Sequence, residues 1–134
     1  MKARTTTRRG ALLLVAMMVA LLTLSGVALA AFFPGTNGPD RIGGTNRADT
    51  IRGYGGNDLL DGNNGPDRIT GGPGDDNIAD GTVHEQSTDR IWGSSGNDNI
   101  YVQNNPAHKD YVNCGSGKDF VRYDFKDVLR NCPR

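Results

Sequence analysis

The chain has 134 residues, with fifteen basic and fifteen acidic side chains and 19 glycines. Four of the basic residues and none of the acidic ones lie in the first thirty positions, so residues 31–134 carry a net charge of −4. The remaining arginines are scattered rather than clustered, which argues against a nucleic-acid-binding protein and favours cations as partners.

The first thirty residues have the three parts of a secretory signal peptide: a basic start, an apolar run over 11–24, and small residues at Ala28 and Ala30. We expect residues 1–30 to be cleaved after Ala30, and the mature protein to be secreted and extracellular, without a membrane segment. A retained membrane anchor is the competing interpretation, since 11–31 is nearly long enough to cross a bilayer. The adjacent Arg8 and Arg9 leave general and twin-arginine export both open.

A nine-residue repeat begins near Gly35, after a short segment over 31–34. In each unit an aspartate is followed two positions later by isoleucine or leucine. The aspartates are Asp40, Asp49, Asp58, Asp67 and Asp76, and the aliphatic residues are Ile42, Ile51, Leu60, Ile69 and Ile78. The first six positions of a unit carry turn formers, so each unit is predicted to be a tight turn followed by a very short strand. Repetition at this period predicts a solenoid.

Two units are expected to make one coil, with Ile42, Leu60 and Ile78 facing inward from one wall and Ile51 and Ile69 from the other. Such a core is thin. Burying one aliphatic side chain returns about 1.5–3 kcal/mol, whereas ordering each residue of a unit costs roughly 1–2 kcal/mol of backbone entropy. Hydrogen bonds between coils and a bound ligand must therefore supply the rest of the stabilisation.

Units such as GNNGPDRIT (62–70) and GGPGDDNIA (71–79) resemble the haemolysin-type or RTX calcium-binding nonapeptide repeat, G-G-x-G-x-D-x-U-x. The chain is also similar to small secreted proteins of actinobacterial type with these repeats. The resemblance implies an all-β fold, a parallel β-roll or β-helix solenoid, which binds several Ca²⁺ ions between stacked turns. The implied metal ligands are Asp40, Asp49, Asp58, Asp67, Asp76, Asp98 and Asp119. Asp40 would share an ion with Asp58, Asp58 with Asp76, and Asp49 with Asp67.

Calcium also fits the residue chemistry, because this ion takes six to eight oxygen ligands in irregular geometry, whereas Zn²⁺ prefers His or Cys. Stacked carboxylates without a cation would repel one another, so we expect folding to be coupled to ion binding. Turn capping is the competing interpretation of any single aspartate, but it does not require aspartate in every copy. Asp61, Asp75 and Asp80 are expected to be solvated or outside direct coordination.

Beyond Ala79 the repeat continues with loops inserted near 80–88 and 102–109. Asp89, Asp98, Asp110 and Asp119 each precede an aliphatic residue by two positions. Looping out the insertions would stack Asp76 on Asp98 and Asp98 on Asp119. The units of Asp89 and Asp110 lack the expected glycines, which argues against carbonyl ligation at those turns. The predicted β-roll covers 35–113.

Residues 114–134 are expected to cap the roll. Aromatic residues gather late in the chain and are expected to cover the end of the core, with a carbohydrate-binding platform as the alternative; they are Trp92, Tyr101, Tyr111, Phe120, Tyr123 and Phe125. Cys114 and Cys132 are the only cysteines. In an oxidising compartment they are predicted to form a disulfide, with two free thiols as the competing interpretation.

The sequence therefore predicts a secreted calcium-binding repeat protein, a binding or structural module with a cell-envelope or glycan surface as its candidate partner. The alternatives are a polysaccharide-active enzyme and a carbohydrate-binding adhesin. Catalysis is not expected, because the sequence contains no G-x-S-x-G or H-E-x-x-H motif. The repeats also start directly after the expected signal, which leaves no upstream segment for a catalytic domain.

Overall fold

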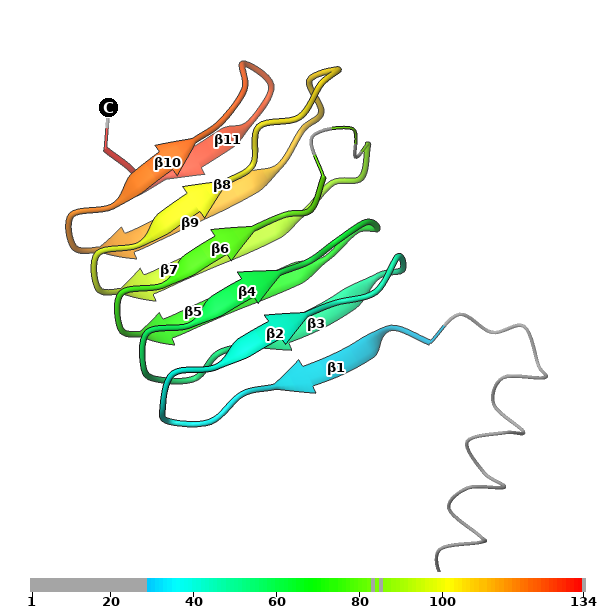
Figure 1. Cartoon of the computed structure of the whole chain (residues 1–134). Helices are drawn as coiled ribbons and strands as arrows, with labels where there is room; N and C mark the ends of the chain where they lie inside the picture. The colour runs from blue at the N-terminus through cyan, green and yellow to red at the C-terminus, as the bar shows by residue number, and fades with distance from the viewer. Residues whose placement is uncertain (1–28, 83, 85, 134) are drawn as a thin grey trace, which may run out of the picture.

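The computed structural model describes residues 29–82, 84 and 86–133, so all but the last two residues of the expected signal peptide lie outside the described residues. The described part is built from eleven strands in two parallel sheets, stacked as successive coils (Figure 1). The predicted all-β parallel roll is confirmed. Among these residues, none forms a helix with the length and hydrophobicity of a membrane span.

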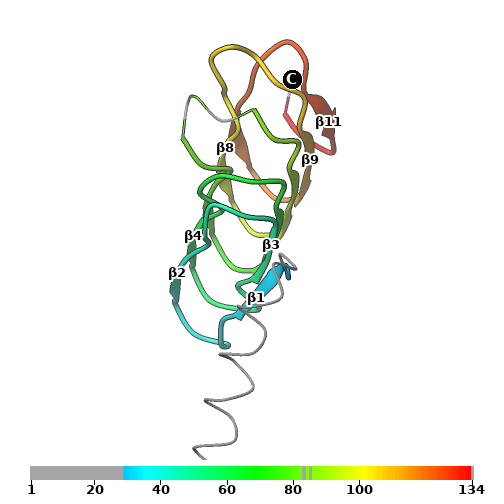
Figure 2. The same cartoon turned by 90° about the vertical axis from the view of Figure 1, so that its right-hand side faces the viewer.

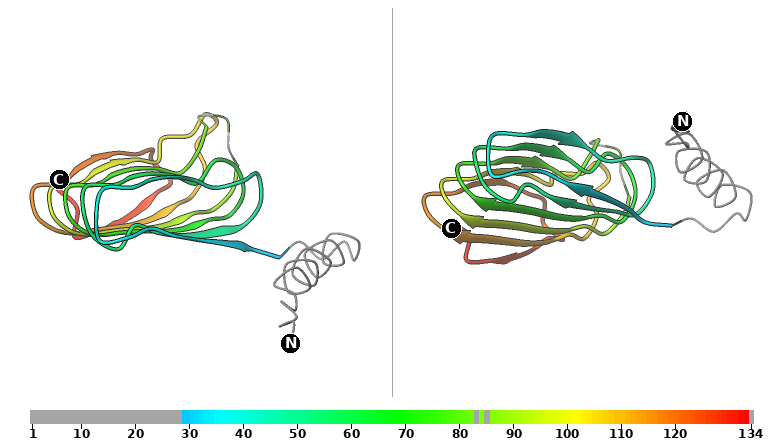
Figure 3. Two further views of the ribbon diagram at one scale, coloured as in Figure 1. Left: turned by 60° about the horizontal axis from the view of Figure 1, so that its bottom comes forward. Right: turned by 90° about the horizontal axis from the view of Figure 1, so that it is seen from below.

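Odd-numbered and even-numbered strands form separate sheets, because the chain changes sheet at every turn. The first sheet contains β1 (Ala31–Pro34), β3 (Asp49–Arg52), β5 (Arg68–Pro73), β7 (Arg90–Ser95), β9 (Tyr111–Ser116) and β11 (Val128–Arg130). The second contains β2 (Arg41–Gly43), β4 (Leu59–Asp61), β6 (Asn77–Ala79), β8 (Asn99–Tyr101) and β10 (Phe120–Arg122). One strand from each sheet and the two turns between them make a coil, and Figure 3 shows these coils as flattened loops lying on one another.

The core is the narrow space between the two sheets, filled mainly by one inward apolar residue per strand, to which Cys114 of β9 and Val102 after β8 are added. Successive coils place like residues in register, so that Ile42, Leu60 and Ile78 are paired on the second sheet and Ile51 pairs with Ile69 on the first. This confirms the two predicted walls. The central members are at most 2% exposed, whereas Ile42 is only partly buried, because it belongs to the first strand of its sheet and has a neighbouring strand on one side only.

Both predicted insertions leave the strand register intact. Ile69 pairs with Ile91 on β7, and Ile91 pairs with Val112 on β9. The inserted residues connect β6 to β7 and β8 to β9, and both loops project from the right-hand edge of the roll in Figure 1. Longer turns therefore widen one edge of the coil without moving the strands.

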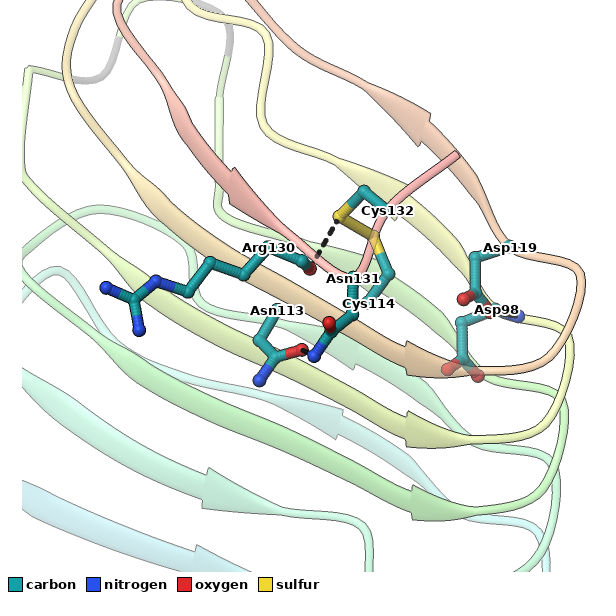
Figure 4. Close-up of a disulfide and its surroundings, with 7 residues drawn as sticks. All are labelled: Asp98, Asn113, Cys114, Asp119, Arg130, Asn131 and Cys132. Carbon is teal, nitrogen blue, oxygen red and sulfur yellow. Dashed lines mark hydrogen bonds between the residues drawn. A yellow bond between two sulfur atoms is a disulfide. The ribbon is translucent and has the colours of Figure 1, made fainter. Parts of the chain in front are cut away.

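The C-terminal segment continues the same coil pattern up to β11. β10 pairs with β8, and β11 pairs with β9. The predicted disulfide is confirmed: Cys114, in β9, is bonded to Cys132, just after β11 (Figure 4). Beside it, the Asn131 side-chain amide donates to Asn113 Oδ1 over 3.0 Å. The last coil is thus covalently attached to the one beneath it.

The expectation that the late aromatic residues cover the end of the core is wrong. Trp92 follows the inward Ile91, so strand alternation turns it outward, and Arg68 lies 5.2 Å from its ring centre. Phe125 is 84% exposed. The other four late aromatic residues are also exposed: Tyr101, Tyr111, Phe120 and Tyr123. Leu129 and Cys132 pack against the last part of the core instead.

The two adjacent leucines of β4 allow a test of which side chains of a strand face the core. Leu60 is fully buried and Leu59 is 41% exposed. We expect Leu60→Ala to lower the free energy of unfolding by about 2–5 kcal/mol, because it leaves a cavity in a core with few other side chains. Leu59→Ala should change it by less than about 0.5 kcal/mol. Urea denaturation in saturating calcium measures both, and equal losses would contradict the inward assignment.

Candidate metal centres

The turns form two stacked rows, one at each edge of the roll. We call the turns that precede the even-numbered strands the first turn row, which carries Asp40, Asp58, Asp76, Asp98 and Asp119. The turns that precede β3 and the later odd-numbered strands form the second turn row, which carries Asp49, Asp67, Asp89, Asp110 and Asp127. Figure 2 looks onto the edge of the second row.

Within each row the aspartates are stacked by hydrogen bonds from the backbone of one coil to the carboxylate of the next. The bonds of the first row run from Asp40 N–H to Asp58 Oδ1 (2.8 Å), Asp58 N–H to Asp76 Oδ1 (2.8 Å), Asp76 N–H to Asp98 Oδ1 (3.0 Å) and Asp98 N–H to Asp119 Oδ1 (3.0 Å). The sequence separation rises from 18 to 22 and 21 where the insertions intervene. The predicted stacking of Asp76 on Asp98 and of Asp98 on Asp119 is confirmed.

The second carboxylate oxygen distinguishes the central turns. Oδ2 of Asp58, Asp76 and Asp98 is buried and has no hydrogen-bond partner among the described residues. A buried charged oxygen without a donor is strongly unfavourable. In the middle of the first turn row, each carboxylate therefore has one oxygen bonded to the backbone and a second oxygen that requires a positively charged partner.

Asp40 and Asp49, in the first two turns, differ from these central residues. Asp40 Oδ2 accepts hydrogen bonds from the backbone N–H (2.5 Å) and hydroxyl (3.0 Å) of Thr36. Asp49 Oδ2 is bonded in the same way by Thr45, over 2.5 and 2.9 Å. The sequence signal is threonine at the second position of the unit, which the sequence reasoning did not use. These two carboxylates have less need of a cation.

The backbone φ angles also distinguish the later turns from the first turn. Positive φ occurs at the second and fourth positions of the later units, as in Tyr54 and Gly56 (φ 73° and 102°) and in Ser94 and Gly96 (φ 89° and 133°). Thr36 and Gly38 at the equivalent positions do not have it. Left-handed backbone at two positions makes a tight turn.

Glycine at the first position of a unit lets carboxylate and carbonyl oxygens approach one another. A Cβ on Gly53 would overlap Asp58 Oδ2 and lie 2.7 Å from the carbonyl oxygen of Gly71. Gly71 stands in the same relation to Asp76 Oδ2 and to the carbonyl oxygen of Gly93, at 2.8 Å. Each of these glycines thus borders oxygens from two successive coils, which is the donor set that Ca²⁺ prefers.

Burial perturbs the titration of the stacked carboxyls. It raises the pKa of Asp76 from 3.8 to about 6, and the charges of Asp98, Asp58 and Asp75 add to the rise, while the hydrogen bond from Asp58 N–H opposes it. Burial also raises the pKa values of Asp58 and Asp98. In the second row it raises those of Asp110 and Asp127 to about 6. Without a cation, the folded roll therefore holds protons more tightly than the unfolded chain.

Three carboxylates outside the regular register were expected to be solvated or outside direct coordination. Asp75 is exposed and accepts a hydrogen bond from Asn97 N–H (2.7 Å), and Asp61 accepts one from Asn63 N–H (2.9 Å). For Asp80 the expectation of a solvated side chain is wrong, because it is only 3% exposed. It lies with Asp89 and Asp110, and the ligand atoms of the three are within 4.8 Å of one another.

Asp127 was missed by the sequence reasoning. Its Oδ1 accepts a hydrogen bond from Asp110 N–H over 3.0 Å, so it closes the second turn row. Leu129 follows it by two positions, which is the repeat signal that could have identified it.

The glycine at the first position of a unit can be tested by adding a methyl group. We expect Gly71→Ala to lower the free energy of unfolding by about 1–3 kcal/mol, because its Cβ overlaps a carboxylate and overpacking is not relieved in a close-packed turn. Gly38→Ala is the matched control, since the nearest atom to its Cβ is Thr36 Oγ1 at 3.9 Å. Thermal unfolding in saturating calcium compares the two, and an equal effect would contradict the close approach.

The pKa shifts predict the pH dependence of the metal-free protein. Asp76 has a folded-state pKa of about 6 against 3.8, so its protonation favours the folded state fully below pH 3.8, and that contribution is lost as the pH rises through 6. In metal-free buffer we expect the folded fraction of the chain to increase as the pH falls from 7 to 4.5. Far-ultraviolet circular dichroism at a fixed temperature measures this fraction, and a continuous loss of β-structure on acidification would contradict the assignment.

Comparison with known families gives one result. The family model of the RTX calcium-binding nonapeptide repeat, in four copies, matches residues 34–69, 58–81 and 86–103. Comparisons with curated proteins and with solved structures find no match. The matched ranges contain the central turns of the first row, including the carboxylates of Asp58, Asp76 and Asp98. RTX repeats bind Ca²⁺. The chain therefore contains, over residues 34–81 and 86–103, the repeats of the RTX calcium-binding nonapeptide family.

Proposed function

We propose that this protein is a secreted calcium-binding structural module whose roll folds as Ca²⁺ ions bind between stacked turns. The observation that carries the proposal is the set of buried, unpartnered Oδ2 atoms of Asp58, Asp76 and Asp98. Calcium neutralises these carboxylates and removes the repulsion along the row. Because the core holds one aliphatic residue per strand, folding depends on that neutralisation.

The ligands in this proposal are those of the regular register, Asp40, Asp49, Asp58, Asp67, Asp76, Asp98 and Asp119. Support is strongest between the turns over 53–58, 71–76 and 93–98, where unpartnered carboxylate oxygens and first-position glycines occur together. It is weaker at Asp40 and Asp49, because Thr36 and Thr45 already bond their second oxygens. The ions are therefore expected to concentrate in the middle of the first turn row.

Secretion fits both the chemistry and the N-terminal sequence. Residues 1–30 have the pattern of a signal peptide, and the Cys114–Cys132 disulfide suits an oxidising compartment. Extracellular calcium modules typically bind in the range of about 10⁻⁴–10⁻³ M, so folding would follow export. The role is structural or adhesive rather than catalytic, with a cell-envelope or glycan surface as the candidate partner.

A carbohydrate-binding adhesin is the second candidate. Arg90, Trp92, Tyr111, Asn113 and Arg130 line a pocket of about 230 Å³ on the first sheet. Aromatic faces beside hydrogen-bonding side chains suit sugar rings. Retention of the calcium-loaded protein on immobilised polysaccharide separates this function from a purely structural one.

Calcium titration followed by far-ultraviolet circular dichroism tests the main proposal. We expect the chelated protein to be largely unfolded and to gain β-structure as calcium is added. Asp76→Asn should raise the midpoint calcium concentration by about tenfold or more, equivalent to about 1.4 kcal/mol, because Asp76 has an unpartnered oxygen and lies between two turns.

Asp40→Asn is the matched control in the same row, and it should raise the midpoint much less because Thr36 bonds the second oxygen of Asp40. A chelated protein that is as ordered as the calcium-loaded one would refute calcium-coupled folding. Equal midpoints for the two variants would refute only the ranking of the ligands.

A further inference from the structure

A second kind of acidic site lies where the two insertions meet the roll. Asp80, Asp89 and Asp110 are 3%, 0% and 0% exposed, and each contributes a carboxylate oxygen within 4.8 Å of the others. Asp80 is the first residue after β6, whereas Asp89 and Asp110 immediately precede β7 and β9. Three carboxylates from the two longest turns thus share one buried volume.

Asp80 occupies a backbone position that is glycine in the preceding coils. Gly44 N–H donates to Asp61 O, Gly62 N–H to Ala79 O, and Asp80 N–H to Tyr101 O, so Gly44, Gly62 and Asp80 are equivalent in the stack. A Cβ on Gly62 would overlap Asp67 Oδ2 and lie 3.2 Å from Ile69 Cδ1. A short turn therefore has no space for a side chain there.

The insertion removes that restriction. The step from Asp67 to Asp89 is 22 residues, against 18 from Asp49 to Asp67. In the longer turn the side chains of Asp80 and Asp89 are both inside the coil. The insertion thus replaces a glycine-lined turn with one that contains an additional carboxylate.

Two further observations point to a bound cation in this volume. Asp110 Oδ1 accepts a hydrogen bond from Asp89 N–H (2.9 Å), but Asp110 Oδ2 is buried and has no hydrogen-bond partner in the part of the chain that the structure describes. Asn104 is 5% exposed, and its amide nitrogen donates to Asp80 Oδ2 (3.1 Å). Its Oδ1 has no hydrogen-bond partner within residues 29–82, 84 and 86–133. Because both amide atoms are bonded to one carbon, this second unpartnered oxygen also lies beside Asp80.

We propose that Asp80, Asp89 and Asp110 bind one hard divalent cation, Ca²⁺ or a chemically similar ion, and that Asn104 positions Asp80. The donors are all oxygens, which favours the hard cations Ca²⁺, Mg²⁺ and Mn²⁺ over Zn²⁺. Unlike the first turn row, this site is built from three side-chain carboxylates and needs no glycine turn. Its ion fastens both insertions to the roll, and it does not depend on binding at the first turn row.

Counting bound ions in the full chain tests this site. Asp80→Asn removes one carboxylate but keeps the shape of the side chain, and Asp80→Gly restores the residue found at Gly44 and Gly62. Asp75→Asn is the control, because it removes the same charge from an exposed position whose stacked neighbours, Asn57 and Asn97, are already asparagine. Isothermal titration calorimetry with CaCl₂, MgCl₂ and MnCl₂ in separate experiments gives the number of ions bound and identifies the metal.

We expect both Asp80 variants to bind one ion fewer per chain than the Asp75 variant, while calcium still induces β-structure in their circular dichroism spectra. Binding of a single ion by the unaltered chain, lost on either Asp80 substitution, would support this site and refute the repeat sites. Equal numbers of ions in all variants, with each of the three metals, would overturn the inference and leave calcium binding by the repeats intact.

Discussion

The roll depends on one arrangement, a carboxylate held between coils with one oxygen bonded to backbone and the other buried. Asp58, Asp76 and Asp98 each accept the N–H of the aspartate one coil earlier, which fixes their position. Their second oxygens have no hydrogen-bond donor among the residues that the structure describes. The same bond that aligns the coils therefore creates a row of buried carboxylates that the thin core cannot offset, and the proposed calcium ions would neutralise this row.

Other features follow from this arrangement. Glycine stands at the first position of these units because a Cβ there would occupy the space of the carboxylate, as at Gly53 and Gly71. Positive φ at the second and fourth positions makes the turns tight. Thr36 shows the alternative, since its hydroxyl bonds Asp40 and its turn has ordinary backbone. In the first coil, both oxygens of the aspartate thus accept hydrogen bonds or face solvent without requiring an ion.

The two edges of the roll differ in the length of their turns. The first turn row keeps short turns from Asp40 to Asp119, while both insertions fall in the second row. Strand register is unaffected, because stacking is set by the inward aliphatic residues and the backbone ladder, to which the loops do not contribute. Turn length on one edge is therefore free to vary, and Asp80 is buried only because its turn is longer.

The sequence alone determined the solenoid, the two walls and the position of the insertions, because a fixed period with one aspartate and one aliphatic residue allows a single register. It also indicated the disulfide, because the chain contains only two cysteines. Tertiary structure alone decided which carboxylates are left unpartnered. Threonine or glycine at one turn position changes the bonding of Asp40 relative to Asp76, and that depends on distances across coils. The burial of Asp80 was likewise decided by how its loop lies in space, which the period does not encode.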